Sequence, residues 1–431
     1  MMSTEELYKI FLNYPVISTD SRKIEKGSLF FALKGENFNG NKYAADAISK
    51  GAAYSIIDEE DYHIGENTIL VNNVLKALQK LANYHRKQLR IPILGITGTN
   101  GKTTTKELIA SVLAKKFSVS FTQGNLNNHI GVPLTLLAMN SETEFGVVEM
   151  GANHPGEIAE LCKIADPDYG IITNIGQAHL EGFGSFDGVK RTKSELYKYI
   201  HSKGGTIFYN SDNPILAELN KEIKNKISYG RKDASFIGEP IQSPPFIHVK
   251  ANFEKGVLYL NSNLIGDFNF ENILAAACIA NYFKVDPLKI QLAIKAYHPT
   301  NNRSQLIQKG DLKIIMDAYN ANPTSMSASI ASFLRNLSGD NYMILGDMLE
   351  LGEYSAAEHA KIIELIPESI TKNTFLVGNE FSKAGERHAI KTFMSVSELN
   401  LYLAENPIKN GNLLIKGSRG IQLEKILEIL N

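Results

Sequence analysis

The sequence predicts an α/β protein of three domains, and chain length and hydrophobic patterning carry that prediction. The chain has 431 residues, which at roughly 150 residues per domain corresponds to about three domains. From Pro92 onward, short apolar runs alternate with helical patterns, as in ILGIT, KELIASVLAKKF, FGVVEM and EIAELCKIA. Such alternation is typical of a largely parallel sheet with helices on both faces.

The expected domains cover residues 1–82, 83–296 and 297–431. The first has its own strand-like runs, SLFFAL and AAYSIID, which indicate a small separate α/β domain. The third starts where HPTNNR interrupts a helical pattern, and it continues with the strand-like runs KIIMDAY, YMILGDM, TFLVG and NLLIKGS. This pattern favours a second doubly wound, Rossmann-like sheet.

Charge and cysteine content exclude several classes of protein. The 45 lysines and arginines balance 46 acidic residues, so there is no overall field for nucleic acid or anionic lipid. Cys162 and Cys278 lack metal-site spacing and leave no disulfide framework, which suits a reducing compartment. The N-terminus does not resemble a secretory signal, and the apolar run 273–283 is too short for a membrane span. We expect a cytoplasmic monomer with no nucleic-acid or membrane partner.

The stretch GITGTNGKTTTKE, which starts at Gly95, has the strand, loop and helix context of a phosphate-binding loop. Gly98 and Gly101 allow tight turns that point backbone amides at phosphate oxygens. Lys102 is then expected at the terminal phosphates and the Thr103 hydroxyl at magnesium.

One position departs from the strict phosphate-loop pattern, because Ile96 stands where a glycine is usual and Gly95 is one step off. The alternative interpretation is a glycine-rich turn before an ordinary helix. The Gly-Lys-Thr-Thr run in a strand-to-helix context favours the phosphate loop.

Three polar clusters follow later apolar runs, at the edge where doubly wound sheets bind ligands. Glu149 directly follows a pair of valines, Asn174 and His179 lie past the next run, and Lys193 lies on the following helix. A carboxylate, an imidazole and a hydroxyl are suitable ligands for magnesium between ATP and an acyl acceptor. Singly, these residues could be a loop cap, a structural histidine and a solvated lysine. Their joint placement favours a site.

Seven strings resemble the Mur ligases, in the family's order and across essentially the whole chain. They are GTNGKTTTKE, NLNNHIGVPLTLL, EMGANHPGEI, TNIGQAHLEGFGS, DAYNANPTSM, LGDMLELG and IKGSRG. The resemblance implies an N-terminal domain that holds the UDP end of a cell-wall precursor and a central ATPase domain. It also implies a C-terminal Rossmann-like domain that closes over the site.

The resemblance implies catalytic roles for Lys102, Glu149, His179 and Lys193, and it implies ATP and two Mg²⁺ ions as cofactors. The metal ligands would be Thr103, Glu149, His179 and Lys193. In the family, the lysine that matches Lys193 is carbamylated by CO₂, which turns a cation into an anion that divalent metal attracts. Further ATP contacts are expected at Gly98, Thr99, Asn100, Gly101, Thr104, Asn272, Arg303, Asp317, Tyr319 and Asn320, with Asn269 as a weaker candidate.

The N-terminal string TDSRKIEKGSLFFALKGENFNG resembles the family's uridine-binding region, although Asn39 stands where an acidic residue is expected. For each substrate contact, loop or cap chemistry is the alternative, because Asn, Ser and Asp favour turns. The implied contacts are Ser21, Arg22, Lys34 and Gly35 for uridine, Asn125, Asn128 and His129 for the acceptor peptide, and Lys416, Ser418 and Arg419 for the incoming amino component.

The implied reaction is ATP-dependent amide formation. The terminal carboxylate of UDP-MurNAc-tripeptide would attack the γ-phosphorus of ATP, and the amine of D-alanyl-D-alanine would then displace phosphate from the acyl phosphate. Lys102, the two metal ions and the helix N-terminus would neutralise the converging anions. Closure of the C-terminal domain would exclude water. Glu149 and His179 are candidates for the base that deprotonates the amine.

Three alternatives stay open at this point. A sister ligase adds diaminopimelate or lysine to the dipeptide precursor, but the chain lacks the DNPR signature expected for the diaminopimelate-adding enzyme, and ANHPGEI with NLNNHIGVP favours dipeptide addition. Folate polyglutamation uses the same chemistry. A non-catalytic sensor of nucleotide and UDP-sugar peptide is expected to lose the metal and lysine constellation, which is present here.

Overall fold

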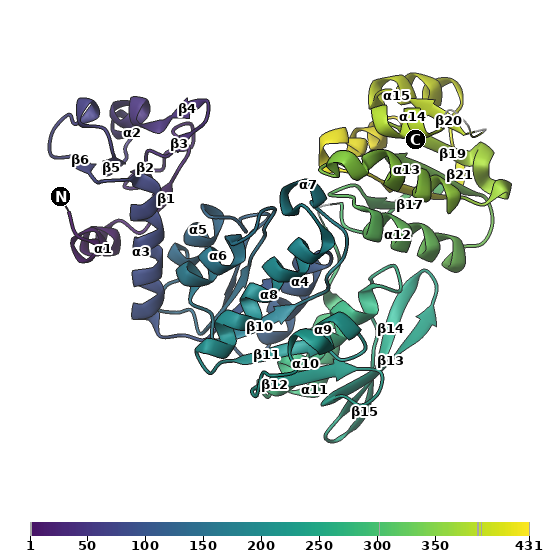
Figure 1. The fold of residues 1–431 in the computed structure, drawn as a ribbon, viewed down its shortest axis with the longest axis horizontal. Helices are drawn as coiled ribbons and strands as arrows, with labels where there is room; N and C mark the ends of the chain where they lie inside the picture. The colour runs from purple at the N-terminus through teal and green to yellow at the C-terminus, as the bar shows by residue number, and fades with distance from the viewer. Residues whose placement is uncertain (1, 301, 386–387, 389, 431) are drawn as a thin grey trace.

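The computed structural model describes residues 2–300, 302–385, 388 and 390–430, arranged as three sheet-based units along a bent path (Figure 1). The main sheets have four, nine and six strands, and β3 and β4 form an additional two-stranded sheet. Helices pack on these sheets, which confirms the predicted α/β class and the succession of a small, a central and a third unit. In the described ranges, no helix is long and apolar enough to cross a membrane.

The first unit is built on four parallel strands in the order β1-β2-β5-β6. Its first helix begins at a capping box, in which Ser3 and Glu6 each accept a hydrogen bond from the other's backbone amide. The elements are α1 (Thr4–Asn13), β1 (Ile17–Ser18), β2 (Leu29–Phe31), β3 (Lys34–Gly35), β4 (Phe38–Asn39), η1 (Gly40–Tyr43), α2 (Ala44–Ser49), β5 (Tyr54–Ile57), η2 (Glu60–Tyr62), β6 (Thr68–Leu70) and α3 (Val74–Leu89).

Helix α3 connects the first unit to the second, and the Asn73 side chain caps its N-terminus. It packs against α1 on one side and against α5 and α6 of the second unit on the other. Leu78 and Leu81 are buried in one apolar core that continues from the first unit to the central sheet. The expected domain limit between residues 82 and 83 falls inside this helix, whereas α11 ends at Ala296, next to the second expected limit. Both limits stay predictions.

The central sheet has the strand order β15-β14-β13-β12-β11-β10-β7-β9-β8. Its β8 to β13 part is parallel, while β14 and β15 extend one edge as antiparallel strands that the sequence patterning did not reveal. The elements are β7 (Ile93–Thr97), α4 (Lys102–Leu113), β8 (Val119–Phe121), α5 (Gly131–Leu137), β9 (Phe145–Glu149), α6 (Glu157–Ala165), β10 (Tyr169–Ile172), α7 (Leu180–Phe183), α8 (Phe186–Ser202), β11 (Thr206–Asn210), α9 (Pro214–Leu219), β12 (Lys226–Gly230), β13 (Phe236–Ser243), β14 (Phe246–Phe253), β15 (Gly256–Leu260), α10 (Asn269–Tyr282) and α11 (Pro287–Ala296).

Helices cover both faces of this sheet. Residues of α4, α10 and α11 share one buried apolar cluster with the strands, and residues of α5, α6 and α8 belong to the cluster on the opposite face. Strand β7 lies between β9 and β10. The chain passes from β7 to β8 and β9 on one side of it and then crosses to β10 on the other side. The carboxyl ends of these three strands therefore surround the switch point where doubly wound sheets bind their ligands.

The third unit has six strands in the order β16-β17-β21-β18-β19-β20, all parallel except β16. Apolar clusters lie on both of its faces. The elements are β16 (Gln305–Lys309), β17 (Asp311–Asp317), α12 (Pro323–Asn336), β18 (Asn341–Gly346), η3 (Gly352–Tyr354), α13 (Ser355–Glu364), η4 (Glu368–Asn373), β19 (Thr374–Val377), α14 (Asn379–Gly385), β20 (Lys391–Phe393), α15 (Val396–Glu405), β21 (Asn410–Lys416), η5 (Arg419–Ile421) and η6 (Leu423–Glu428).

Truncating Leu78 tests the continuous core between the first two units. Leu78→Ala removes a fully buried side chain, so we expect the free energy of unfolding to fall by about 2–5 kcal/mol. Leu292→Ala, at an exposed leucine of α11, should change it by no more than about 0.5 kcal/mol. Urea titration followed by circular dichroism measures both. Equal effects of the two substitutions would contradict the buried role of Leu78.

Candidate active site

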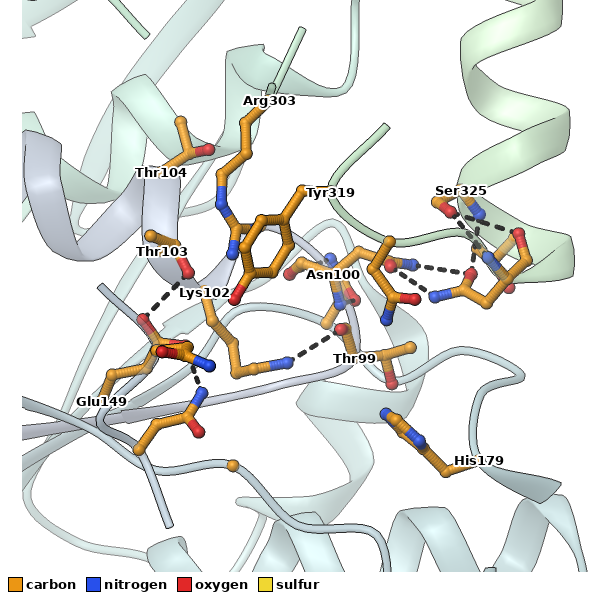
Figure 2. Close-up of a pocket in the computed structure, with 18 of the residues that line it drawn as sticks. Thr99, Asn100, Lys102, Thr103, Thr104, Glu149, His179, Arg303, Tyr319 and Ser325 are labelled. Carbon is orange, nitrogen blue, oxygen red and sulfur yellow. Dashed lines mark hydrogen bonds between the residues drawn. The ribbon is translucent and has the colours of Figure 1, made fainter. Parts of the chain in front are cut away.

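A cavity of about 940 Å³ lies at the carboxyl ends of β7, β9 and β10 and is closed on its other side by the third unit. Figure 2 shows side chains from both units pointing into this space. Its walls include the phosphate loop, the segments after β8 and β9, the start of α10, and residues that precede α12. Most of the predicted site residues lie along these walls.

The phosphate loop is tightly constrained by its neighbours. Gly98 has a φ of +145°, and a Cβ there would lie 2.0 Å from the Thr173 hydroxyl oxygen, so no larger residue fits. The Thr99 amide donates to the backbone carbonyl of Asn174 at 2.9 Å, and the Asn100 amide donates to the side-chain oxygen of Asn174, also at 2.9 Å. Ile96, which stands where the phosphate-loop pattern usually has glycine, is fully buried within β7. This difference from the pattern therefore lies in the strand rather than in the loop.

Lys102 opens helix α4, directly after Gly101 in the left-handed conformation. Its ammonium donates to the carbonyls of Gly98 at 2.8 Å and Thr99 at 3.0 Å (Figure 2). Burial lowers the pKa of Lys102 from its ordinary value, and the nearby Glu149 partly opposes this shift. Loop amides, a helix N-terminus and this lysine therefore converge where a polyphosphate would bind.

Thr103, in the first turn of α4, contacts Glu149, at the carboxyl end of β9. The Thr103 hydroxyl donates to Glu149 Oε2 at 3.0 Å, and the Asn127 amide donates to Oε1 at 2.8 Å. Neighbouring oxygen ligands of an octahedral magnesium ion lie about 2.9 Å apart, because each is about 2.0–2.1 Å from the metal. The two oxygens already have the spacing of such an edge, so these residues fit a magnesium ion. Asn127 was not predicted from the sequence.

The other two predicted metal ligands lie apart from this pair. His179 has a left-handed backbone, with φ 51°, and forms an ion pair with Glu350 of the third unit, which lowers the pKa of Glu350. Figure 2 shows its ring away from Glu149. Lys193 is only 2% exposed and donates to the Ala152 carbonyl at 3.3 Å. No group of three or more His, Cys, Asp or Glu side chains among the described residues is arranged as a metal site.

The ammonium of Lys193 is in an unusual environment. Burial comes first among the effects that lower its pKa well below the ordinary value, followed by the positive charge of Lys102. The nitrogen also lies 5.6 Å from the centre of the Phe183 ring. A lysine held in this way is readily neutral and therefore nucleophilic.

The start of α10 packs against the phosphate loop. Asn272 donates to Asn269 at 2.8 Å and accepts from the Thr105 hydroxyl at 3.0 Å. Its Oδ1 atom would be 2.7 Å from a Cβ at residue 101, which accounts for Gly101. Asn269 also lines the cavity, and it donates to the Ile265 carbonyl while its side-chain oxygen accepts from Asn272.

The predicted residues of the third unit separate into a cationic pair at the cavity and a buried support. The Arg303 guanidinium stacks on the Tyr319 ring at 3.6 Å, and that of Arg419 lies 5.4 Å from the same ring. Lys416 and Asp317 instead bind each other at 2.6 Å. Burial alone would raise the pKa of Asp317, but the charge and hydrogen bond of Lys416, together with hydrogen bonds from Ser329 and the Ser304 amide, lower it.

Ser418 and Asn320 have smaller, local roles. The Ser418 hydroxyl accepts from the Leu349 amide at 3.0 Å and donates to the Ala321 carbonyl, so it holds two loops together. Asn320 lines the cavity, while its side-chain oxygen accepts from the next backbone amide.

Contacts between the second and third units are partly apolar, because Ile265 and Phe246 pack into the apolar cluster of the third unit, and partly polar. Asn322 donates to Asn100 of the phosphate loop at 2.8 Å, and the Thr324 hydroxyl accepts from the Gln177 amide at 3.2 Å. Asn322 is also the N-cap of α12. Asn322 was not predicted from the sequence, although an Asn-Pro pair before a helical pattern is a recognisable helix start.

The predicted acceptor-peptide residues line the cavity. Asn128 accepts from the Ile130 and Gly131 amides at 3.1 and 2.9 Å, as a turn residue does, and the His129 carbonyl accepts from Gln79 of α3. Asn125 also lies on the wall, as does Thr104 of α4.

The predicted uridine contacts lie in the first unit, away from this cavity. Arg22 forms an exposed ion pair with Asp20, and Lys34 binds Asp58 at 2.9 Å and Glu59 at 3.0 Å. Asn39, the residue that departs from the family pattern, donates to the same Glu59. Ser21 is buried, and Gly35 is exposed on β3.

Comparisons with known proteins agree with this architecture. Residues 13–86, 96–280 and 302–412 match the family models "Mur ligase family, catalytic domain", "Mur ligase middle domain" and "Mur ligase, glutamate ligase domain". The UDP-N-acetylmuramoyl-tripeptide–D-alanyl-D-alanine ligase of Bacillus subtilis is 34% identical over 96% of this chain and 92% of its own. That of Escherichia coli is 31% identical over 99% and 95%.

Two solved structures are similar over nearly their whole length. The crystal structure of MurF from Acinetobacter baumannii has a TM-score of 0.88 at 30% identity, covering 99% of this chain and 98% of that one. MurF ligase from Thermotoga maritima in complex with ADP has a TM-score of 0.85 at 27% identity and covers 97% of both chains. With three domain matches in order and this identity over the full length, the chain belongs to the Mur ligase family.

Proposed function

We infer that this chain is an ATP-dependent ligase that joins D-alanyl-D-alanine to UDP-MurNAc-tripeptide, giving the pentapeptide precursor of peptidoglycan. The observation that carries this inference is the convergence of Lys102 and the Thr103–Glu149 pair in one cavity that a third unit closes. Relatives at 31–35% identity over most of the chain carry the name of this reaction. The diaminopimelate ligase and folylpolyglutamate synthase structures, at 15% and 14% identity, share the fold alone.

The chemistry requires a carboxylate to attack a polyanion. A carboxylate oxygen of the tripeptide bonds to the γ-phosphorus, the bond to the bridging oxygen breaks, and ADP leaves. The amine of D-alanyl-D-alanine then adds to the carbonyl carbon, phosphate leaves with the former carboxylate oxygen, and the amine loses a proton. Magnesium, held by Thr103 and Glu149, would shield the negative charges.

This chain's own residues supply the remaining stabilisation. The loop amides, the N-terminus of α4 and Lys102 neutralise charge on the transferred phosphoryl group. Arg303, held on the Tyr319 ring, adds a cation from the closing unit. Both oxygens of Glu149 already accept hydrogen bonds and His179 is paired with Glu350, so either residue would have to leave a partner to act as the base that deprotonates the amine.

We also propose that Lys193 is carbamylated. Only a neutral amine reacts with CO₂, and burial together with Lys102 favours that neutral form. The reaction forms a bond between Nζ and the carbon of CO₂ and releases one proton, which leaves an anion. The carbamate on Lys193 would attract the ammonium of Lys102, whereas a charged Lys193 would repel it. The carbamate would also give a second magnesium ion a ligand.

We place the reaction in the cytoplasm and, through the cell wall, in cell growth and division. Its substrate carries a UDP group, and the chain has no net charge that would attract it to a lipid surface. One copy of the chain supplies every residue named around the cavity, so we propose that it acts as a monomer.

A substrate panel tests the ligase inference. With UDP-MurNAc-tripeptide and ATP, D-alanyl-D-alanine should stimulate ADP release at least about tenfold, whereas diaminopimelate, lysine or glutamate should not, because only the true amine traps the acyl phosphate. A coupled ADP assay with lysine-containing and diaminopimelate-containing tripeptides measures this. ADP release that no amine stimulates would favour the sensor alternative.

Removal of Lys193 tests the carbamate. Lys193→Ala should lower ligation by about a hundredfold or more, through loss of one charge-stabilising contact, while nucleotide binding stays intact. Lys198→Ala, at an exposed lysine of the same helix, should leave the rate unchanged. After exposure to ¹³CO₂, the wild type should show a carbamate ¹³C resonance that Lys193→Ala lacks. An unimpaired Lys193→Ala enzyme would refute the proposal.

Exchanging Asn322 tests the closed arrangement. Asn322→Ser keeps an N-cap for α12 but removes the amide that donates to Asn100, so closure over the phosphate loop should weaken. Water then reaches the acyl phosphate, and we expect ADP release to exceed ligated product by severalfold. Parallel assays of ADP and of product measure the ratio. A ratio that stays at one would show that the contact does not exclude water.

A further inference from the structure

Lys106 is a buried lysine that the reaction described above does not use. It lies on α4, one turn beyond Lys102, and its side chain is 0% exposed. Among the described residues, its ammonium has no hydrogen-bond partner. An ammonium removed from water without hydrogen bonds is costly, so its presence in a folded protein calls for an explanation.

The surroundings of Lys106 point to the metal-binding carboxylate. Its nitrogen lies 3.6 Å from Glu149 Oε2 and 4.0 Å from Glu107 Oε1, with the Phe121 ring on another side at 5.8 Å. Glu107 is otherwise engaged, because its Oε2 accepts from the Tyr297 hydroxyl at 2.7 Å. Glu149 is therefore the nearer partner of Lys106.

Lys106 and the cavity lie on different sides of the Glu149 carboxylate. Thr103 and Glu149 line the cavity, whereas the fully enclosed Lys106 reaches Oε2 from the protein interior. A cation that binds Thr103 Oγ1 and Glu149 Oε2 together would break the hydrogen bond between them. Asn127 then still holds Oε1, and Lys106 is the interior group that faces Oε2.

We propose that Lys106 is a positioning residue that holds the Glu149 carboxylate in its metal-binding orientation. The inference rests on the magnesium site of the proposed function. Carboxylates that bind metals depend on such outer partners, and loss of a partner typically lowers metal affinity by about 10–100-fold. The ammonium attracts Oε2 and so keeps the carboxylate from rotating away from the cavity.

Manganese binding tests this role apart from catalysis. Lys106→Met keeps an unbranched side chain of nearly the same length and removes its charge. In electron paramagnetic resonance titrations with Mn²⁺ in the presence of ADP, we expect the Mn²⁺ dissociation constant to rise at least about tenfold. The ADP dissociation constant without divalent cation should stay within about twofold of the wild type, because Lys106 does not face the nucleotide.

Glu107→Gln is the matched control, since it removes the other carboxylate near Lys106 but keeps an acceptor for Tyr297. It should bind Mn²⁺ like the wild type, and an equal loss there would overturn the assignment to Glu149. Lys106→Gln serves as a second variant where Lys106→Met does not fold.

Unchanged Mn²⁺ affinity in a folded Lys106 variant overturns the proposal, as does loss of ADP binding without metal, which would indicate a purely structural lysine. A wild type that binds ADP but no Mn²⁺ would instead refute the magnesium site itself. Neither result depends on which amine the enzyme ligates.

Discussion

The contact between Thr103 and Glu149 is the constraint around which the site is arranged. The two residues come from different segments, and the parallel register that places Ile96 opposite Glu149 brings them together. Thr103 also belongs to the first turn of α4, so its contact with Glu149 lies beside the N-terminus of that helix. The polar groups on this side of the cavity are thus positioned by the central sheet and the helix that follows β7.

The two neighbouring units are attached to this sheet by different forces. The first unit shares a continuous apolar core with it through α3. The third has an apolar cluster of its own, into which, among the described residues, only Ile265 and Phe246 of the central unit pack, and it meets the cavity through polar contacts such as Asn100 with Asn322 and His179 with Glu350.

The sequence was most informative where function depends on neighbours along the chain. Gly98 lies in the loop after β7, Lys102 and Thr103 begin the helix that follows it, and Glu149 ends a buried strand, so local patterns were enough to single them out. The succession of strands and helices was likewise predictable. Family resemblance, not local pattern, supplied Arg303 and the other residues of the third unit.

Other features depend on contacts that no local pattern records. Asn127 lies 22 residues from Glu149 in sequence, and Asn100 and Asn322 are 222 residues apart. The antiparallel edge formed by β14 and β15 has no motif of its own. Lys106 looks like an ordinary helix lysine until its burial is known. Lys416 and Asp317 both line the cavity, but that they also form an ion pair with one another could not be read from their separate motifs.

Helix α3 has a consequence for how this molecule can be divided. It packs against α1 of the first unit and against α5 and α6 of the second along overlapping stretches, and both contacts belong to the same apolar core. A fragment cut in the middle of α3 would expose apolar surface on both pieces of the helix. A separately expressed first or second unit should therefore include the whole of α3, through Leu89. A small molecule bound against α3 would affect both units.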